Sequence, residues 1–201
     1  AEMVSQLLFG ESVKILEIDK DGWIKAEGIA DGYRGFCRLN QFVIMDAPIQ
    51  EYPEYTGDWV EQVWVNEQKL MIPFGSNLSL LNAAIPGYSI SYTGNIFKAS
   101  SNLKSEKFIT EIASIFLNIP YLWGGKSVFG IDCSGFVQSV YKMMNIVLPR
   151  DANTQAGEGE PVGFLQEAVC GDLAFFDDEN RDIVHVGILL NDHQIIHASG
   201  K

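Results

Sequence analysis

The most informative stretch of this sequence is Gly130-Ile131-Asp132-Cys133-Ser134-Gly135-Phe136-Val137, which follows a glycine-rich loop. Apolar residues continue at helical spacing as far as Met144, so we expect a helix that begins after Asp132. A helix N-terminus carries partial positive charge and free backbone N–H groups, and both stabilise a thiolate and later an oxyanion. Cys133 is therefore a candidate nucleophile with a lowered pKa. The alternative is that it is a small buried apolar residue.

Two histidines near the end of the chain supply a second signal. Predicted strands that end at Leu190 and begin at Gln194 flank a turn, and positions on facing antiparallel strands pair when their numbers sum to a constant. An odd-length loop centred on Asn191 would place His185 and His197 side by side, whereas a two-residue loop would place them on opposite faces. With the odd loop, one imidazole acts as a base and the other orients it. The alternative is two unrelated polar residues on a half-exposed sheet.

Cys133, His185 and His197 together have the composition of a papain-like catalytic set, with a nucleophile, a general base and an orienting group. Binding of a metal ion by the same three residues is the rival interpretation. One cysteine and two histidines 12 positions apart lack the spacing of a metal-binding knuckle. We therefore expect neither a metal nor a cofactor.

The composition of the 201-residue chain restricts the other function classes. It has 14 Lys and Arg against 26 Asp and Glu, a net charge of −12, and 47% hydrophobic against 20% charged residues, which is typical of a globular protein. The acidic balance argues against binding of nucleic acid or of an anionic membrane surface. No apolar run reaches the length of about 18 residues that a membrane span needs. Three cysteines without close spacing predict no disulfide framework, although a single Cys37–Cys170 bridge stays open.

The first half of the chain has the pattern of β-structure. Short β-like runs are broken by Gly and Pro, and Asp-Gly dipeptides at 21–22 and 31–32 predict hairpin turns. Short strands at this spacing favour small β-barrels. The expected domains are a first barrel at 1–47, a linker and second barrel at 48–100, and an α+β domain at 101–201.

A faint repeat favours two copies of one barrel. The stretch 7–16 aligns with 72–81, 65 residues later, and the same offset places Gly22 on Gly87. In the second half of the chain, apolar residues at helical spacing from Phe108 to Ile119 predict a helix that Pro120 ends.

Residues 105–201 resemble the NlpC/P60 cysteine peptidases. The motifs that carry the resemblance follow the order of the family: Pro120 to Gly125, Gly130 to Val137, Leu148 to Asp151, Gly171 to Phe176, His185 to Ile188 and Ile196 to Ala198. The first half resembles two bacterial SH3-like domains, and the whole arrangement resembles the γ-D-glutamyl-L-diamino acid endopeptidases that process cell-wall peptides. The resemblance implies an α+β fold, in which a papain-like NlpC/P60 catalytic domain is preceded by two small SH3-like β-barrels.

The resemblance also implies roles for individual residues. Cys133 is the nucleophile, His185 the base and His197 the third polar residue of the catalytic set. Tyr121 would lie beside the reacting carbonyl, where its hydroxyl assists the oxyanion. The other implied substrate-binding residues are Trp123, Asp132 and Ser134 in the catalytic domain, Asp151 near the substrate amine, and Glu11 and Tyr33 as candidates for the same amine from the first SH3-like domain.

The implied reaction is hydrolysis of the γ-D-glutamyl-diamino acid bond in murein peptides with a free N-terminal L-Ala, as part of cell-wall peptide recycling. The alternative is a murein hydrolase that acts on polymeric peptidoglycan, with the SH3-like domains as wall anchors. A third possibility, an inactive binding module, conflicts with the intact Cys133, His185 and His197. A fourth, an acyltransferase acting on lipid, conflicts with the acidic charge and the lack of a membrane-binding helix.

The ends of the chain and its location give weaker signals. The catalytic domain of the family usually continues past the third catalytic residue, whereas this chain stops at Lys201, so we expect a truncated C-terminal end. The first residue is Ala1 rather than Met, which leaves a removed leader open. Unpaired cysteines and recycling chemistry favour the cytoplasm, and a removed leader would favour the periplasm. The expected partner is the murein peptide, while the preferred diamino acid and the oligomeric state do not follow from the sequence.

Overall fold

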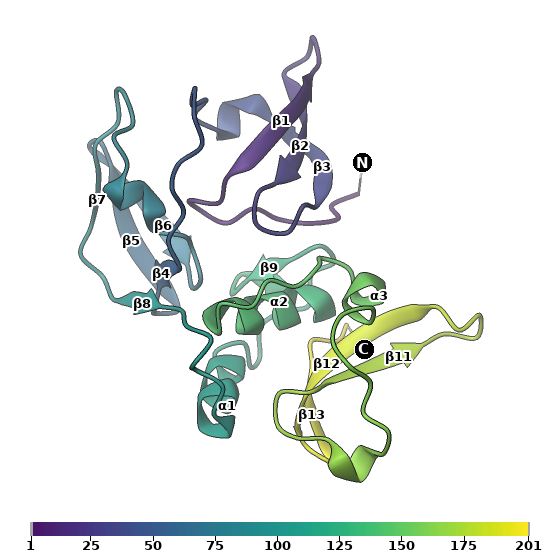
Figure 1. The fold of residues 1–201 in the computed structure, drawn as a ribbon. Coiled ribbons are helices and arrows are strands. Elements are labelled where there is room, and N and C mark those ends of the chain that lie inside the picture. Colours follow the sequence, from purple (N-terminus) through teal and green to yellow (C-terminus); the bar gives the residue numbers. More distant parts are fainter. Residues whose placement is uncertain (1, 201) are drawn as a thin grey trace. The chain divides into compact units, whose positions relative to one another are not determined.

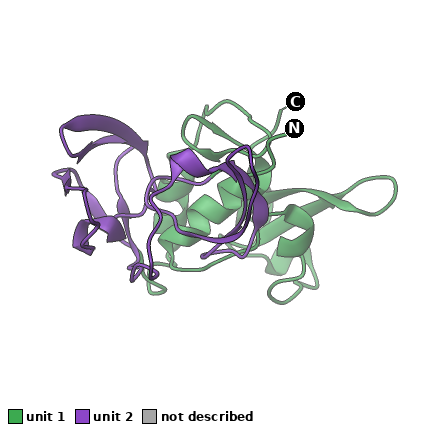
Figure 2. Cartoon of the chain, turned by 90° about the horizontal axis from the view of Figure 1, so that it is seen from above, with its two compact units in different colours: residues 1–6, 99–201 green, residues 7–98 purple. Residues whose placement is uncertain are grey.

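The computed structural model describes residues 2–200 of the chain (Figure 1). The chain forms two compact units, one from residues 7–98 and the other from residues 1–6 together with 99–201 (Figure 2). The candidate nucleophile and both candidate histidines belong to the second unit. None of the helices described within residues 2–200 has the length and apolar character that a membrane crossing requires.

The unit 7–98 begins with a three-stranded antiparallel sheet in the order β1-β2-β3. Its elements are β1 (Val13–Ile18), β2 (Trp23–Gly28) and β3 (Arg34–Arg38), followed by the 3-10 helix η1 (Leu39–Gln41). Both predicted Asp-Gly turns occur, with Gly22 and Gly32 in the left-handed conformation at φ 78° and 68°. Ile24 and Ala26 of β2 are buried and give this sheet an apolar face.

The rest of this unit contains a second sheet and a separate strand pair. The second sheet has the order β6-β5-β7, with β5 (Val60–Val65), β6 (Gln68–Pro73) and β7 (Ile90–Tyr92). The separate pair consists of β4 (Glu54–Thr56) and β8 (Ile96–Lys98). A 3-10 helix, η2, spans Ser79–Asn82. Val63, Ile72 and Leu78 form the buried core, and Phe9 packs against them. The Asn77 N–H also donates to the Phe9 carbonyl at 2.9 Å, so the segment before β1 contributes to this second core.

The two closed barrels expected from the sequence are not found among residues 2–200. The described strands form open sheets, and no pairing joins the first strand of a sheet to its last. Closure of a barrel requires that pairing. Residues 7–10 belong to no strand, and they contact Asn77 instead of extending the first sheet.

The sequence repeat is preserved at its glycines and lost beyond them. Gly10 and Gly75, which the repeat aligns, have nearly equal φ angles of 81° and 78°, and Gly22 and Gly87 have φ angles of 78° and 81°. The chain then forms β1 after Gly10, whereas it forms the 3-10 helix η2 after Gly75. The aligned glycines therefore adopt similar backbone conformations, while the elements that follow them differ.

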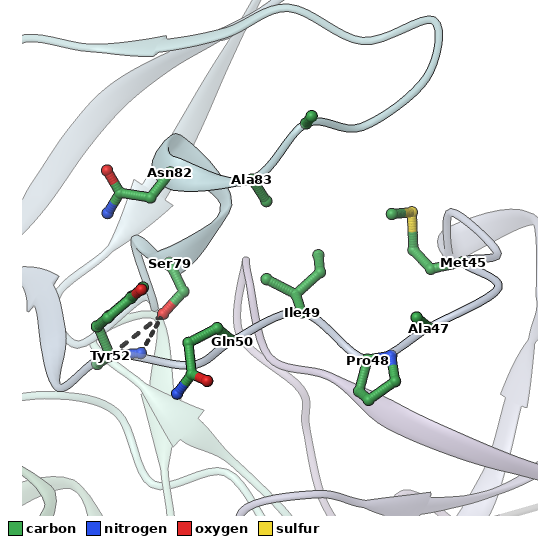
Figure 3. Close-up of a pocket in the computed structure, with 10 residues that line it drawn as sticks. Met45, Ala47, Pro48, Ile49, Gln50, Tyr52, Ser79, Asn82 and Ala83 are labelled. Atoms are coloured by element: carbon green, nitrogen blue, oxygen red, sulfur yellow. Dashed lines mark hydrogen bonds between the residues drawn. The ribbon is translucent and has the colours of Figure 1, made fainter.

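The segment from 48 to 53 packs against η2. The Tyr52 N–H donates to the Ser79 hydroxyl oxygen at 2.7 Å, and the Ser79 hydroxyl donates to the Tyr52 carbonyl at 3.3 Å. Pro48 and Ile49 line an open pocket of about 250 Å³ beside these contacts (Figure 3). This part of the predicted linker is therefore anchored to η2 at Tyr52.

The unit that contains Cys133 combines helices with a three-stranded sheet. Its elements are α1 (Glu106–Ser114), β9 (Lys126–Ser127), β10 (Gly130–Ile131), α2 (Cys133–Met143), α3 (Ala152–Gln155), η3 (Leu165–Glu167), β11 (Leu173–Asp177), β12 (Ile183–Asn191) and β13 (Gln194–Ile196). The sheet is antiparallel in the order β11-β12-β13, and β9 pairs with β10. Because α2 packs against β12, the start of the helix and the middle of the sheet meet in one core.

The helix α1 is shorter than the sequence predicts. Its α-helical bonding ends at Ser114, and the N–H groups of residues 115–117 bond to carbonyls three residues back, as in a tight 3-10 turn. Asn118, in the left-handed conformation with a φ of 63°, follows this turn. Phe116 packs edge-on against Phe136 of α2, with ring centroids 5.8 Å apart, so the turn still contributes to the core.

Candidate active site

Cys133 is the first residue of α2, as the sequence predicts, and it is only 6% exposed. Asp132 caps the helix, because its Oδ1 accepts the Gly135 N–H at 2.7 Å. Gly135 has no room for a side chain, since a Cβ there would lie 2.2 Å from the carbonyl oxygen of Gly125. The glycine-rich loop thus packs directly on the first turn of α2 and fixes the position of Cys133.

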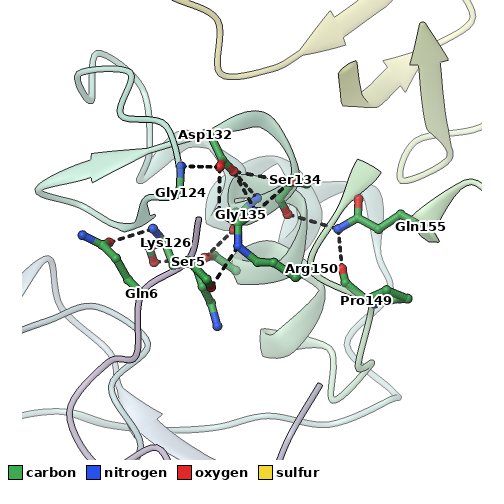
Figure 4. Close-up of polar contacts among 11 residues, drawn as sticks. Ser5, Gln6, Gly124, Lys126, Asp132, Ser134, Gly135, Pro149, Arg150 and Gln155 are labelled. Atoms are coloured by element: carbon green, nitrogen blue, oxygen red, sulfur yellow. Dashed lines mark hydrogen bonds and ion pairs between the residues drawn. The ribbon is translucent and has the colours of Figure 1, made fainter. Parts of the chain in front are cut away.

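A buried ion pair holds the start of this helix (Figure 4). Arg150 donates from Nη2 to Asp132 Oδ2 at 2.6 Å and from Nη1 to Asp132 Oδ1 at 3.1 Å. Nη1 also donates to the Ser134 hydroxyl oxygen at 2.8 Å, and Asp132 Oδ2 accepts the Gly124 N–H at 2.8 Å. The Asp132 carboxylate therefore ties the loop before Cys133 to the helix turn after it.

Arg150 is a residue of the site to which the sequence analysis assigned no role. The available signal was the arginine between Pro149 and Asp151, but its partner Asp132 lies 18 positions away. Asp132 and Ser134, predicted to bind substrate, have polar atoms that bond to Arg150 within the chain. Their substrate-binding roles stay predictions, and the contacts show that both side chains help to hold the start of the helix at Cys133.

We expect Arg150→Met to lower the free energy of unfolding by about 3–5 kcal/mol, because it leaves the buried Asp132 carboxylate without its cation. The Arg150 and Asp132 side chains are 1% and 7% exposed. Urea unfolding measures the loss. Lys107→Met is the matched control in the same unit, since it breaks an exposed pair with Glu111 and should cost about 0.5 kcal/mol. Equal losses in the two variants would contradict the role of Arg150.

The two candidate histidines lie together on one face of the sheet. His185 Nε2 is 2.8 Å from His197 Nδ1, and the rings meet edge to face with centroids 5.0 Å apart. His185 lies on β12, and His197 directly follows β13. Phe176 of β11 packs beside the His185 ring, with a centroid distance of 5.7 Å. The His185 imidazole is therefore held between neighbours from the two flanking strands.

The histidines reach one face by a route that differs from the prediction. The loop between β12 and β13 has two residues, 192–193, rather than an odd number centred on Asn191, and Asn191 pairs with Gln194. A two-residue loop alone would place the histidines on opposite faces. The register shifts by one residue just before Asn191, which leaves Leu190 as the extra residue of a β-bulge. The extra residue of the bulge therefore places His185 and His197 on the same face, as the odd loop was expected to do.

Gly187 leaves the space that His197 occupies. A Cβ on Gly187 would lie 2.9 Å from the His197 Cβ and 2.5 Å from Cδ1 of Ile195. Contacts this short force the neighbouring residues to move. The glycine in the middle of β12 thus lets the histidine of the next strand approach His185.

We expect Gly187→Ala to lower kcat roughly 100-fold, because the new methyl group displaces His197 and small misplacements of catalytic groups have effects of this size. Initial rates of peptide cleavage measure the loss. Gly35→Ala is the matched control, since Gly35 also lies in a strand and a Cβ there has no heavy atom within 4 Å. Unchanged kcat in Gly187→Ala would show that the position of His197 is not critical.

The pKa of the Cys133 thiol is shifted upward, whereas its position at a helix start predicts a downward shift. Burial raises the pKa of the Cys133 thiol, and the Asp132 carboxylate raises it further. Hydrogen bonds from the backbone N–H groups of Val186, Ser134 and Cys133 lower this pKa, but burial outweighs them. Val186 lies on β12, the strand that also carries His185.

Burial lowers the pKa of His185, and the charge of His197 lowers it further. A raised thiol pKa and a lowered imidazole pKa together give a neutral thiol and a neutral imidazole near pH 7. Since Nε2 of His185 faces His197, the other ring nitrogen, Nδ1, is the one left for the proton transfer that the sequence analysis predicts for His185.

We expect the acid limb of the kcat/KM profile to lie below pH 6.5, the ordinary pKa of histidine. His185 must be neutral to accept a proton, and its lowered pKa keeps it neutral at lower pH. His197→Ala removes one cause of that lowering, so its acid limb should move to higher pH. Initial rates between pH 4 and pH 9 measure both profiles. An acid limb that does not move would contradict the coupling of the two histidines.

Three further predicted site residues belong to the same unit. Burial raises the pKa of Tyr121, and electrostatic interaction with Cys133 and Asp132 raises it further. Trp123 is 57% exposed. Asp151 is exposed just before α3, and its side chain makes no capping bond to that helix. The structure thus leaves the Trp123 ring and the Asp151 carboxylate accessible, and their substrate-binding roles stay predictions.

Glu11 and Tyr33, the candidates for binding the substrate amine, belong to the unit 7–98. Glu11 Oε2 accepts the Leu8 N–H at 2.9 Å, and the Tyr33 N–H donates to Asp31 Oδ1 at 3.0 Å. Burial and the charge of Glu11 raise the pKa of Tyr55 to about 12. Their roles toward a substrate stay predictions.

The three cysteines are free thiols, so the Cys37–Cys170 bridge that the sequence left open is absent. Within residues 2–200, no three His, Cys, Asp or Glu side chains are grouped so that they could hold a metal ion. Cys133 differs from the other two cysteines in its burial and its place at a helix start.

Two protein-family models match the chain: the NlpC/P60 family at residues 118–201 and the bacterial dipeptidyl-peptidase Sh3 domain at residues 1–42. The sequence is 41% identical over 92 residues to the γ-D-glutamyl-L-lysine dipeptidyl-peptidase of Bacillus subtilis (strain 168), which covers 45% of this chain and 31% of that protein. It is 26% identical over 233 residues to the protein of the same name from Bacillus cereus (strain ATCC 10987 / NRS 248), with 98% of this chain and 67% of that protein covered. The chain thus spans about a third of the length of the B. subtilis relative.

A solved structure of an NlpC/P60 family protein from Bacillus cereus ATCC 10987 is similar over 96% of this chain and 72% of that chain. The TM-score is 0.81 at 24% sequence identity. This similarity shows the fold, a papain-like domain of helices and sheet preceded by an SH3 domain. No family model reported above covers residues 48–100, and the second SH3-like domain stays a prediction.

Proposed function

The chain belongs to the NlpC/P60 family, and from this premise we propose that it is a cysteine peptidase that cleaves the γ-D-glutamyl-diamino acid bond of murein peptides. The observation that carries the proposal is the 2.8 Å contact of His185 with His197. His185 lies on β12, and the helix that begins at Cys133 packs against this strand. The names of the Bacillus relatives support the choice of bond. A free N-terminal L-Ala and a role in peptide recycling are part of the same proposal.

The first half of the proposed reaction forms a thioester. His185 Nδ1 takes the Cys133 proton as the sulfur bonds to the γ-carbonyl carbon of D-Glu, and the carbonyl π electrons move to oxygen. The Cys133 N–H and the Tyr121 hydroxyl donate to this oxyanion; loss of one such donor typically costs about 3 kcal/mol. The C–N bond then breaks, and His185 gives its proton to the leaving amine of the diamino acid.

The second half returns the free thiol. His185 takes a proton from a water molecule, whose oxygen attacks the thioester carbon. The C–S bond breaks, the sulfur takes the proton back from His185, and L-Ala-D-Glu leaves as the acid. His197 holds the His185 ring by its contact at Nε2 throughout, so Nδ1 keeps facing the reacting atoms.

The test compares L-Ala-γ-D-Glu-diaminopimelate with its N-acetylated form by mass spectrometry. Release of L-Ala-D-Glu from the free-amine peptide only is the expected result. Cleavage of both peptides would contradict recognition of the free amine and support a hydrolase of polymeric murein. Cleavage of neither would overturn the proposed bond. L-Ala-γ-D-Glu-L-Lys, tested in parallel, shows which diamino acid is preferred.

A further inference from the structure

The first described residues of the chain pack on the catalytic unit rather than on the sheets of 7–98. Residues 1–6 form one compact unit with 99–201. Gln6 Oε1 accepts the Lys126 N–H at 2.9 Å, and the Ser5 hydroxyl oxygen accepts Arg150 Nε–H at 3.1 Å (Figure 4). These contacts join positions 120 and 145 residues apart.

A third contact occurs at the glycine-rich loop. Gly124 has a φ of 78°, and a Cβ there would lie 2.8 Å from the Met3 carbonyl oxygen. The backbone of this N-terminal segment therefore lies directly against the loop whose Gly124 N–H bonds to Asp132 Oδ2. Glycine is required at this position both by the left-handed conformation and by the close approach.

Two of the three contacts meet groups that bond to Asp132, the residue that caps the helix beginning at Cys133. Arg150 uses Nε for Ser5 and both Nη atoms for Asp132, and Asp132 bonds to backbone N–H groups on both sides of Cys133. Among residues 2–200, the acceptor for the Arg150 Nε–H is the Ser5 hydroxyl oxygen, and Arg150 as a whole is 2% exposed. Ser5 and Asp132 therefore hold the guanidinium plane from two sides, and this orientation allows the two parallel bonds to Asp132.

We propose that Ser5 is a positioning residue for Cys133, acting through Arg150 and Asp132; this inference rests on the proposed peptidase function. A buried charged donor that loses its acceptor is costly to leave unpaired. Without the Ser5 hydroxyl, the guanidinium turns to find another acceptor, and the turn weakens its parallel bonds to Asp132. The loop and the first turn of α2 then lose their common anchor, and the Cys133 sulfur moves relative to His185.

The experiment compares Ser5→Ala, Ser5→Thr and Ser101→Ala. Threonine keeps the hydroxyl and tests rescue, and Ser101 is an exposed serine of the same unit outside the site. For Ser5→Ala we expect kcat for L-Ala-γ-D-Glu-diaminopimelate to fall about tenfold with KM nearly unchanged, since misplacement affects the reacting geometry. Ser5→Thr should restore kcat, and Ser101→Ala should match the unchanged chain.

A second readout does not depend on the murein substrate. The rate of Cys133 alkylation by iodoacetamide at pH 7, resolved by mass spectrometry, should fall about threefold in Ser5→Ala, because the sulfur loses N–H groups that stabilise its thiolate. Failure of the peptide assay in the unchanged chain would count against the proposed function alone, since the alkylation comparison still tests Ser5. The inference is overturned if Ser5→Ala lowers the urea midpoint but leaves kcat and alkylation unchanged, or if Ser5→Thr restores neither.

Discussion

Cys133→Ala is expected to abolish turnover of L-Ala-γ-D-Glu-diaminopimelate, with a fall in kcat of about 10⁴-fold or more. The variant lacks the sulfur that bonds to the γ-carbonyl carbon. Alanine keeps the Cβ and the helix start, because the Asp132 carboxylate accepts hydrogen bonds from the Gly135 and Gly124 N–H groups and not from the Cys133 side chain. The measurement is release of L-Ala-D-Glu by mass spectrometry, with circular dichroism to confirm that the variant is folded.

The other two cysteines supply matched controls for this experiment. Cys37 and Cys170 are free thiols that are less buried than Cys133. Cys37→Ala and Cys170→Ala should therefore keep the rate of the unchanged chain. Turnover that survives in Cys133→Ala, or that is lost equally in a control variant, would falsify the assignment of Cys133 as the nucleophile.

For His185→Ala we expect a fall in kcat of about 10⁴-fold, with KM little changed. The raised thiol pKa and the lowered imidazole pKa leave Cys133 as a neutral thiol in the resting chain, so attack requires a base that takes its proton. The same imidazole is needed again to protonate the leaving amine and to activate water. Initial rates at saturating substrate measure the loss.

Two other histidine variants serve as comparisons for the loss of activity in His185→Ala. His193 lies in the turn after β12 and bonds to Asp192, so His193→Ala should be as active as the unchanged chain. His197→Ala should lose less activity than His185→Ala, because His197 orients the ring and does not itself transfer the proton. A larger loss in His197→Ala would reverse the two roles.

Local sequence was sufficient to predict the helix that carries Cys133. Asp132 is a residue type that caps helices, apolar residues recur at a spacing of three and four after it, and both features act between near neighbours. The structure accordingly begins α2 at Cys133. The Asp-Gly turns at 21–22 and 31–32 were predictable for the same reason, since their conformation depends on the glycine itself.

The histidine pair was predictable only in part. The spacing of His185 and His197 indicated a shared face if the hairpin had the right parity, and the structure gives that face. The two histidines share that face because a two-residue loop is combined with a bulge at Leu190, and not because the loop has an odd number of residues. The bulge adds one residue to β12 opposite β13, and the residues of the hairpin alone do not mark Leu190 as that residue.

Periodicity, capping residues and turn dipeptides act over a few positions, and they sufficed for the start of α2 at Cys133 and for the Asp-Gly turns. The ion pair of Arg150 with Asp132, the contact of Ser5 with Arg150 and the open sheets depend on residues that folding brings together, some of them 145 positions apart. The raised pKa of Cys133 likewise depends on residues that folding brings together. It results from burial, which outweighs the helix N-terminus and arises only when α2 packs against the sheet.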